Sequence, residues 1–314
     1  MASIRPLFLV CLAIPATLVA CGGGDDDNQE PPAGPHYTYV VNKAFVPTTN
    51  NQAREFGLDL NDDTVIDNQL GMVLGVLAGR GFTVQATIDE AVAKGSIILL
   101  ADMQTESFSA SNAVGLSVRL GANPTPPACA DTNDMVCGKH LTGTGMFQIS
   151  PSSPSDATLE GKIKSGVFQG GPGTIKLQIA LGGTMPITLE LIGARAKAST
   201  ITDTTVGEII VGGAVTKSAL DNDVIPAIHG QLGPLIARDC KMLTAPPGCG
   251  CGDGTTGKTV LGLFDTAEPK DCAVTVEEIK TNSLIVSLLA PDVTIDGTPA
   301  LSIGLKATAV KATF

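Results

Sequence analysis

Aromatic and imidazole side chains are scarce in this sequence, which has no Trp, two Tyr and three His among 314 residues. Sugar-binding surfaces usually rely on aromatic faces for stacking, so a carbohydrate-binding module is disfavoured. The hydrolase motifs G-x-S-x-G and H-E-x-x-H do not occur. We therefore expect a non-enzymatic protein. A surface hydrolase, in which His140 or His229 meets a Ser or a carboxylate, is a less favoured alternative.

Positive charge is also in short supply. The chain has 20 Lys and Arg against 31 Asp and Glu, which gives a formal net charge of −11. Nucleic-acid-binding proteins neutralise phosphates with basic residues, so nucleic acid is not an expected partner. No apolar run after residue 20 approaches the length of a membrane span. The remaining chain is long enough to form a sizeable core, and we expect an exported globular body.

The N-terminus carries the most specific motif. Arg5 precedes an apolar stretch from Leu7 to Ala20, and the run Leu-Val-Ala-Cys closes at Cys21. This segment resembles a bacterial lipoprotein signal with its lipobox. The resemblance implies that residues 1–20 are a cleaved signal peptide and that Cys21 carries a lipid that anchors the protein to a membrane. A plain secretory signal with an incidental Cys21 is the alternative.

Residues 21–35 follow as a tether rich in Gly, Asp and Pro, a composition typical of disorder. Gly22 comes directly after Cys21. In Gram-negative lipoproteins an Asp at that position often retains the protein at the inner membrane. The resemblance therefore implies anchoring at the outer membrane, facing either the periplasm or the cell surface.

Six of the eight Cys lie beyond the signal peptide and Cys21, an even number that suits an oxidising compartment. Cys129 and Cys137 share one polar loop, so we expect them to pair. Cys249 and Cys251 are too close to pair comfortably, so each is expected to bond Cys240 or Cys272, in an order that stays open. A metal site at this Cys-x-Cys cluster is the alternative, although no His stands at ligand spacing.

The pattern of apolar residues predicts an α+β fold that is rich in antiparallel β-sheet, either sandwich-like or curled, with several covering helices. Residues 36–314 form one disulfide-bonded domain in this interpretation. It is helical over 65–95, β-rich over 96–213, has a helix and the Cys cluster over 214–272, and ends in a helix and strand over 273–314. Expected strands within the β-rich part are 96–103, 114–120, 145–150, 157–167, 174–181, 187–192 and 206–211.

Finer boundaries follow from local signals. Glycines near 79–81 divide residues 65–95 into two helices. Asp223 is the expected N-cap of a helix that Pro234 should kink, and residues 258–264 read as a strand. Thr275 and Glu278 form a capping box that opens a further helix, which should end before Pro291. The alternating residues 300–314 predict a final strand.

An acidic stretch near the start of the domain resembles the calcium loops of EF-hand and dockerin-like modules. Its candidate oxygen ligands occupy alternate positions, as a hard Ca²⁺ ion requires: Asp59, Asn61, Asp63, the Val65 carbonyl and Asp67. Thr64 stands at the turn position usually held by Gly, and Leu70 stands where the bidentate acid should be. An Asp-rich turn that leads into a helix, with no ion, is the alternative.

A fainter match occurs near the C-terminus, where Asp292 and Asp296 align with Asp59 and Asp63. Alone it reads as a turn. One hypothesis joins the two segments, with Asp292 or Asp296 supplying the ligand that is missing at Leu70.

Residues Gly252 to Thr259 match the Walker A pattern letter for letter. We nevertheless expect no nucleotide, because a phosphate-binding loop must link a buried strand to a helix, and residues 260–264 look extended.

The whole chain resembles, with low specificity, lipid-anchored envelope proteins of Gram-negative bacteria that carry an Asp-rich loop near the start and an Asp-Gly loop before a C-terminal strand. The expected function is binding or structural support in the envelope, with calcium as a stabilising ion and an unidentified protein as partner. The first alternative is a carrier of lipid or another amphiphile, which an aliphatic-lined tunnel of several hundred Å³ would favour and a solid core would exclude.

Overall fold

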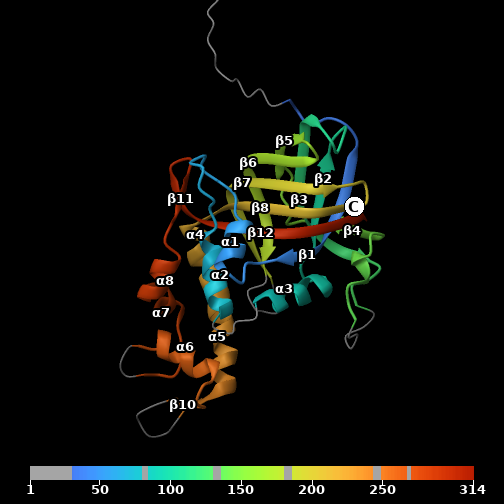
Figure 1. The fold of residues 1–314 in the computed structure, drawn as a ribbon. Helices are drawn as coiled ribbons and strands as arrows, with labels where there is room; N and C mark the ends of the chain where they lie inside the picture. The colour runs from blue at the N-terminus through green and yellow to red at the C-terminus, as the bar shows by residue number, and fades with distance from the viewer. Residues whose placement is uncertain (1–29, 80–83, 130–135, 180–185, 243–248, 267–269) are drawn as a thin grey trace, which may run out of the picture.

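The computed structural model describes residues 30–79, 84–129, 136–179, 186–242, 249–266 and 270–314. The signal peptide, Cys21 and residues 22–29 of the tether lie outside these ranges. Within them the chain folds into an antiparallel β-structure with helices gathered toward one end (Figure 1). The predicted α+β class, dominated by antiparallel sheet, is confirmed.

Eight strands of the described chain close into a barrel in the order β1-β2-β3-β5-β6-β7-β8-β12, because β12 pairs with β1 and β3 pairs with β5. Two short strands are added outside this circuit. β4 pairs with β3 in the antiparallel direction and with the end of β12 in the parallel direction. β11 forms an antiparallel hairpin with β12. The strand bounds are β1 His36–Phe45, β2 Leu99–Gln104, β3 Ser111–Thr125, β4 Gly145–Ile149, β5 Thr158–Lys164, β6 Val167–Ile179, β7 Ile187–Ile201, β8 Thr205–Thr216, β11 Val293–Ile295 and β12 Thr298–Thr313.

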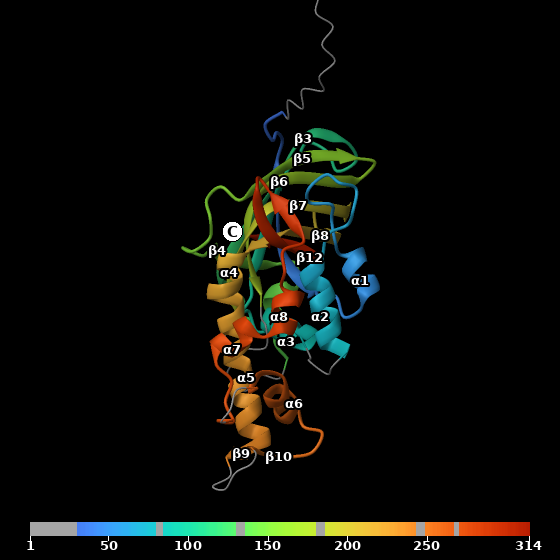
Figure 2. The same ribbon diagram turned by 90° about the vertical axis from the view of Figure 1, so that its left-hand side faces the viewer.

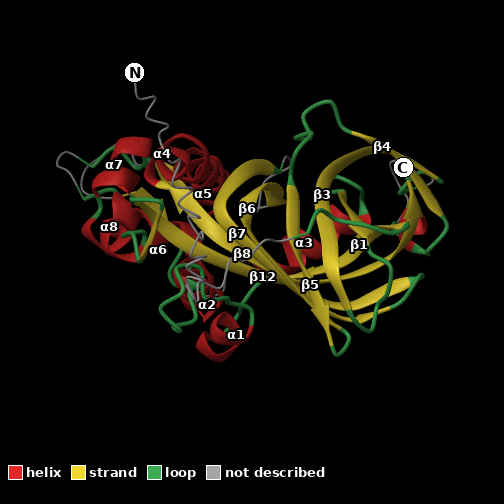
Figure 3. Ribbon diagram, turned by 90° about the horizontal axis from the view of Figure 1, so that it is seen from above, coloured by secondary structure: helices red, strands yellow, loops and turns green. Residues whose placement is uncertain are grey.

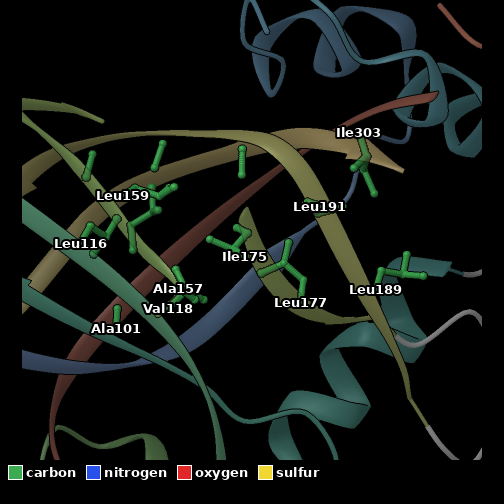
Figure 4. Packing of buried hydrophobic residues seen from close by; sticks show 14 of the residues in the cluster. Ala101, Leu116, Val118, Ala157, Leu159, Ile175, Leu177, Leu189, Leu191 and Ile303 are labelled. Carbon is green, nitrogen blue, oxygen red and sulfur yellow. The ribbon is translucent and has the colours of Figure 1, made fainter. Parts of the chain in front are cut away.

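Side chains from the barrel strands form the largest hydrophobic cluster of the described chain (Figure 4). Residues alternate between core and solvent, as in β5, where Leu159 and Ile163 are buried and Lys164 is exposed. Phe168 is fully buried opposite the small Ala198 of the neighbouring strand. Successive side chains of a strand point to opposite faces of the sheet. A strand in which apolar and polar residues alternate therefore places its apolar side chains in this core.

Helices pack on the outside of the barrel and beyond it. α2 lies against β12, and α3 lies against β1. Seen from above, α5 to α8 gather at one end of the molecule and most of the barrel lies at the other (Figure 3). The helix bounds are α1 Asn50–Glu55, α2 Gln69–Gly79, α3 Val84–Ala93, η1 Lys139–Leu141, α4 Lys217–Ala219, η2 Leu220–Val224, α5 Ile225–Asp239, α6 Thr256–Phe264, α7 Val276–Thr281 and α8 Ser283–Leu288.

We call α5 to α8 the helical end. α5 extends away from the barrel and carries α6 and the small hairpin of β9 (Cys240–Met242) and β10 (Cys249–Cys251) at its far end (Figure 2). Its core is a separate cluster in which Leu232 and Ile236 of α5 meet Val260 and Phe264 of α6. None of the helices in the described ranges combines the length and apolarity needed to cross a bilayer.

Most of the expected elements are confirmed, including the Thr275 capping box and the final strand. The expected division near residues 79–81 falls mostly outside the described residues. The strand expected over 258–264 is wrong, because these residues form α6. Thr255 caps that helix by accepting a hydrogen bond from the Lys258 amide, and Val260, Leu261 and Phe264 are buried on one face of it. The apolar residues of this segment are therefore spaced for one face of a helix, although the same run is also compatible with a strand.

Two expected helix boundaries are also wrong. The helix expected to start at Asp223 is already helical from Lys217, and Thr216 caps it through the Ala219 amide. The C-terminal helix breaks at Asn282, whose side chain accepts hydrogen bonds from the first amides of α8. In both places a capping side chain fixed the boundary at a different residue from the one expected.

Candidate functional site

The acidic loop (residues 59–67) folds back on itself. Its ends are joined by a single bridge between Leu58 and Asp67. Thr64 adopts a left-handed backbone with φ of 69°, the conformation for which calcium loops usually use Gly. The Thr64 amide donates to Oδ2 of Asp59 at 2.8 Å, and the Val65 amide donates to Oδ1 of Asp63 at 2.8 Å. The loop thus has the curvature of a calcium loop without the usual glycine.

An arginine from the barrel neutralises part of this loop. Arg195 of β7 forms a two-pronged ion pair with Asp62, with nitrogen–oxygen distances of 2.8 and 2.6 Å. The hydrogen bond to Arg195 lowers the pKa of Asp62. In turn Asp62 raises the pKa of Arg195, with smaller contributions from Asp59 and Asp67. A protein cation therefore already faces the carboxylates, and sequence analysis did not identify it because it lies 133 residues away.

Asp67 is the buried member of the acidic loop, 7% exposed. Its Oδ2 accepts a hydrogen bond from the Leu60 amide at 2.8 Å. Burial raises the pKa of Asp67, and repulsion from Asp63, Asp292 and Asp59 adds to the effect, while the Leu60 hydrogen bond offsets part of it. The carboxylates of both acidic segments thus act on one another electrostatically.

The C-terminal segment lies beside the acidic loop, as the joint hypothesis requires. Asp292 accepts hydrogen bonds from the Ser302 amide and hydroxyl, and the Ser302 hydroxyl in turn accepts from the Gln69 amide at 2.8 Å. Asp296 and Gly297 form the positive-φ turn between β11 and β12. Asp292 is therefore held close to the start of α2, while Asp296 serves the hairpin turn.

Asn68 connects the two segments most directly. Its amide group donates to the carbonyls of Ala53 and Gly304 and accepts from the amides of Gly71 and Gly304, all at 2.8 to 3.0 Å. A side chain at Gly71 or Gly304 would collide with Asn68, so both glycines are needed for this approach. The i to i+3 contact with Gly71 is an N-cap signal in the sequence, which could have identified Asn68.

The described side chains of the acidic loop do not point to one common position at which an ion could be held. Among them, no group of three or more His, Cys, Asp or Glu is placed to hold a metal. One oxygen remains available, however, since Oδ1 of Asp59 is buried and has no hydrogen-bond partner in the described structure. Asp59, Asn61, Asp63 and Asp67 must shift to coordinate Ca²⁺, and such reorganisation weakens binding.

The six cysteines form three disulfides. Cys129 pairs with Cys137, as expected. The order left open by the sequence is Cys240 with Cys251 and Cys249 with Cys272. The Cys240–Cys251 bond joins the two strands of the β9–β10 hairpin, and the Cys249–Cys272 bond ties that hairpin to the segment between α6 and α7.

The Walker-like stretch follows β10 directly and runs into the first turn of α6. The extended segment expected after it is therefore a helix, and that argument against a phosphate loop is wrong. The Gly257 amide at the start of α6 donates to the Asp239 carboxylate at 2.9 Å, and Lys258 pairs with Asp253 at 2.6 Å. Carboxylates of the protein itself occupy the positions where a phosphate would bind.

Each of the three histidines has a local structural role. His36 pairs with Asp102 on the surface at 2.9 Å, and a ring nitrogen of His229 contacts the Val274 carbonyl at 2.8 Å. His140 is fully buried against Phe147, and neither ring nitrogen has a hydrogen-bond partner in the described structure. Burial lowers the pKa of His140.

An apolar cavity lies where the helical end meets the barrel. We call it the inner pocket, and its volume is about 140 Å³. Side chains from α2, α3, η2, α5, α6, α8 and three strands line it, and Gln231 of α5 is the one polar residue among the described lining residues. The lining residues are Val46, Leu70, Val73, Leu74, Val84, Ile179, Leu189, Val224, Ile228, Gln231, Leu232, Phe264, Ile285, Leu288, Leu289, Ile303 and Leu305.

The chain matches no protein-family model, and no curated protein or solved structure shows significant similarity to it.

Proposed function

We propose that this protein is a lipid-anchored outer-membrane lipoprotein with a non-enzymatic binding or structural role in the envelope. The observation that carries this proposal is the set of three disulfides in a chain that begins with a lipobox-type signal. Disulfides persist in exported proteins and are rare in reducing compartments. They agree with Cys21 as the site of lipid attachment.

Cell fractionation tests this anchoring. The wild-type protein is expected in the outer-membrane fraction, and Cys21→Ala is expected to leave it because the atom that carries the lipid is gone. Cys11→Ala, which changes a cysteine inside the signal peptide, is the matched control and should not alter the distribution. Equal membrane association of Cys21→Ala and wild type would show that Cys21 is not the anchor.

The environments of His140 and His229 support a non-enzymatic role. A hydrolase needs a base within hydrogen-bond reach of its nucleophile or water. His229 is engaged by a backbone carbonyl, and His140 is buried against an aromatic ring. Neither position presents a histidine to a serine or a carboxylate.

We also propose that the acidic loop binds Ca²⁺ with a dissociation constant of about 10⁻⁴ to 10⁻³ M, the range of weak extracellular sites. The left-handed Thr64 and the unpartnered Oδ1 of Asp59 support this proposal. The ligands are Asp59, Asn61, Asp63 and Asp67 with the Val65 carbonyl, and the nearby Asp292 adds negative charge.

Calorimetric unfolding of the oxidised chain in EDTA and in millimolar Ca²⁺ tests the loop. Bound Ca²⁺ should raise the melting temperature, with saturation near millimolar concentrations. Asp63→Asn should reduce the shift, while Asp203→Asn, an acid in the β7–β8 turn, should leave it unchanged. An identical melting temperature in both conditions would contradict calcium binding and would indicate that the loop is only a turn that leads into α2.

A second function, transport or storage of an amphiphile, is favoured by the inner pocket. Its lining is apolar apart from Gln231, which is the usual character of a small-molecule site. At about 140 Å³ the pocket is smaller than the several hundred Å³ expected for a lipid carrier. Its size therefore limits the buried part of a ligand to a short hydrocarbon segment.

A further inference from the structure

We propose that the helical end binds a medium-chain anionic amphiphile, with its hydrocarbon tail in the inner pocket and its carboxylate at Lys280. This inference rests on the proposed amphiphile-binding function and assigns its ligand class. It uses two adjoining pockets and one unpaired lysine, none of which takes part in the acidic loop.

The inner pocket sets the length of the tail. An apolar protein cavity of about 150 Å³ stays dry and accepts a molecule the size of benzene. The inner pocket, at about 140 Å³, can therefore bury about six carbon atoms. Leu70 and Val73 of α2 face Leu232 of α5 across this space, so the tail would lie between the barrel side and the helical end.

A second cavity adjoins the inner pocket and supplies the charge. We call it the outer pocket, and its volume is about 200 Å³. Ile285 and Leu289 line both pockets, so the two cavities share part of their walls. The charged residues that line the outer pocket are Lys217, Asp221 and Lys280. A ligand whose tail passes Ile285 and Leu289 would therefore place its head group beside these side chains.

The two lysines of the outer pocket differ in their partners. Lys217 pairs with Asp221 at 2.7 Å, so its charge is already neutralised. Lys280, in the last turn of α7, is half-buried and forms no ion pair with any described residue. An ammonium group beside an apolar wall, with no carboxylate of its own, is complementary to the head group of a fatty-acid-like molecule.

The element between the two pockets can make way for a ligand. α8 has only six residues, and none of them is fully buried. Leu284 and Val286 on its outer face are 48% and 55% exposed. Because so little of α8 is fixed by packing, a small shift of Ile285 joins the pockets at modest cost.

Titration calorimetry with straight-chain carboxylates from butanoate to dodecanoate tests the tail. The protein is the full chain with Cys21→Ala, so that no detergent competes for the site. Each added methylene should tighten binding about fourfold until about six tail carbons fill the inner pocket, which octanoate reaches with its two remaining carbons toward Lys280, after which the gain should stop. Ile228→Phe fills the inner pocket and should abolish binding, whereas Leu284→Phe, on the exposed face of α8, should not change it.

Three head groups on the same tail test the role of Lys280: octanoate, 1-octanol and octylamine. Octanoate should bind most tightly, and Lys280→Gln should weaken it about tenfold while leaving 1-octanol unchanged. Lys241→Gln, which makes the same charge change outside both pockets, is the control. Melting temperatures of all variants confirm that they are folded.

Different results would overturn either the anionic head group alone or the amphiphile site as a whole. Equal binding of octanoate and 1-octanol, unaffected by Lys280→Gln, would overturn the anionic head group and keep the amphiphile site. Loss of the octanoate preference in Gln231→Leu rather than in Lys280→Gln would place the head group in the inner pocket and overturn the role of Lys280. Failure of every chain length and head group to bind would overturn the inference and the amphiphile function together.

Discussion

In the barrel, long strands bury alternate side chains around one continuous core, whereas the helical end joins short helices through a small core and two disulfides. Side chains such as Phe168 are enclosed on all sides in the barrel. In the helical end, α8 has no fully buried residue and separates two cavities. The difference in packing predicts that the barrel is the more rigid part and that the helical end is the part that would move on ligand binding.

The largest expected effect comes from the barrel core. Phe168→Ala should lower the free energy of unfolding by about 3 to 5 kcal/mol, because a fully buried aromatic ring leaves a cavity. Ile228→Ala, at the wall of the inner pocket, should cost about 1 to 2 kcal/mol, because this side chain already borders empty space. Urea unfolding measures both. A larger loss for Ile228→Ala would reverse the comparison.

Removal of a disulfide from the helical end ranks second. Replacing Cys240 and Cys251 together by Ser should cost about 3 kcal/mol, because the bond closes a loop of about 11 residues in the unfolded chain. Amide hydrogen exchange should accelerate in α5 and α6 and stay unchanged in β6 and β7. Uniform acceleration over the whole chain would show that the two regions unfold as one unit.

The contact of Asn68 with α1, α2 and β12 should give the third-largest effect on stability. Asn68→Ala removes four hydrogen bonds to buried backbone groups and should cost about 2 kcal/mol. Asn222→Ala is the control, since Asn222 makes only an exposed contact with Ser218. Thermal unfolding measures both, and equal melting temperatures for the two variants would contradict the role of Asn68 as the connection.

The smallest effect is a pH dependence of opposite sign at two neighbouring acids. The pKa of Asp67 is raised in the folded state, so its contribution to the free energy of unfolding falls as the pH rises above 3.8 through the folded value. The pKa of Asp62 is lowered, so its stabilisation is present above 3.8 and is lost as the pH falls through the folded value. Asp62 is 75% exposed, so solvent limits its contribution to less than about 1 kcal/mol.

Unfolding of Asp67→Asn and Asp62→Asn across this pH range measures the two slopes. Asp67→Asn should reduce the fall in the free energy of unfolding as the pH rises. Asp62→Asn should reduce the fall in the free energy of unfolding as the pH is lowered. Slopes of the same sign would contradict the assigned electrostatics.

Local signals in the sequence predicted much of this fold. Alternation in residues 174–179 and the capping box at Thr275 depend on near neighbours, and both are confirmed. Closure of the sheet into a barrel depends on the pairing of β1 with β12, across about 270 residues, which no local pattern encodes. The strand β1 itself was missed, because it begins at His36, directly after the Pro-rich tether.

The candidate site likewise has parts that the sequence predicted and parts that it did not. The acidic loop was found from its spacing, since alternate oxygens are a local feature. Arg195 reaches that loop from a distant strand, and Lys280 becomes relevant only when α7 and α8 pack beside the barrel. Residue 260 and its neighbours show the limit of local patterns, because the same apolar run suits a buried strand or a helix until Thr255 caps it.

Hydrogen exchange of the Cys21→Ala chain with and without octanoate tests the central claim most directly, that the helical end binds a ligand while the barrel stays rigid. We predict slower exchange in α2, α5 and α8 on addition of octanoate, with the exchange of β5 to β7 unchanged. Protection spread over the barrel strands, or no protection in any segment, would contradict the account.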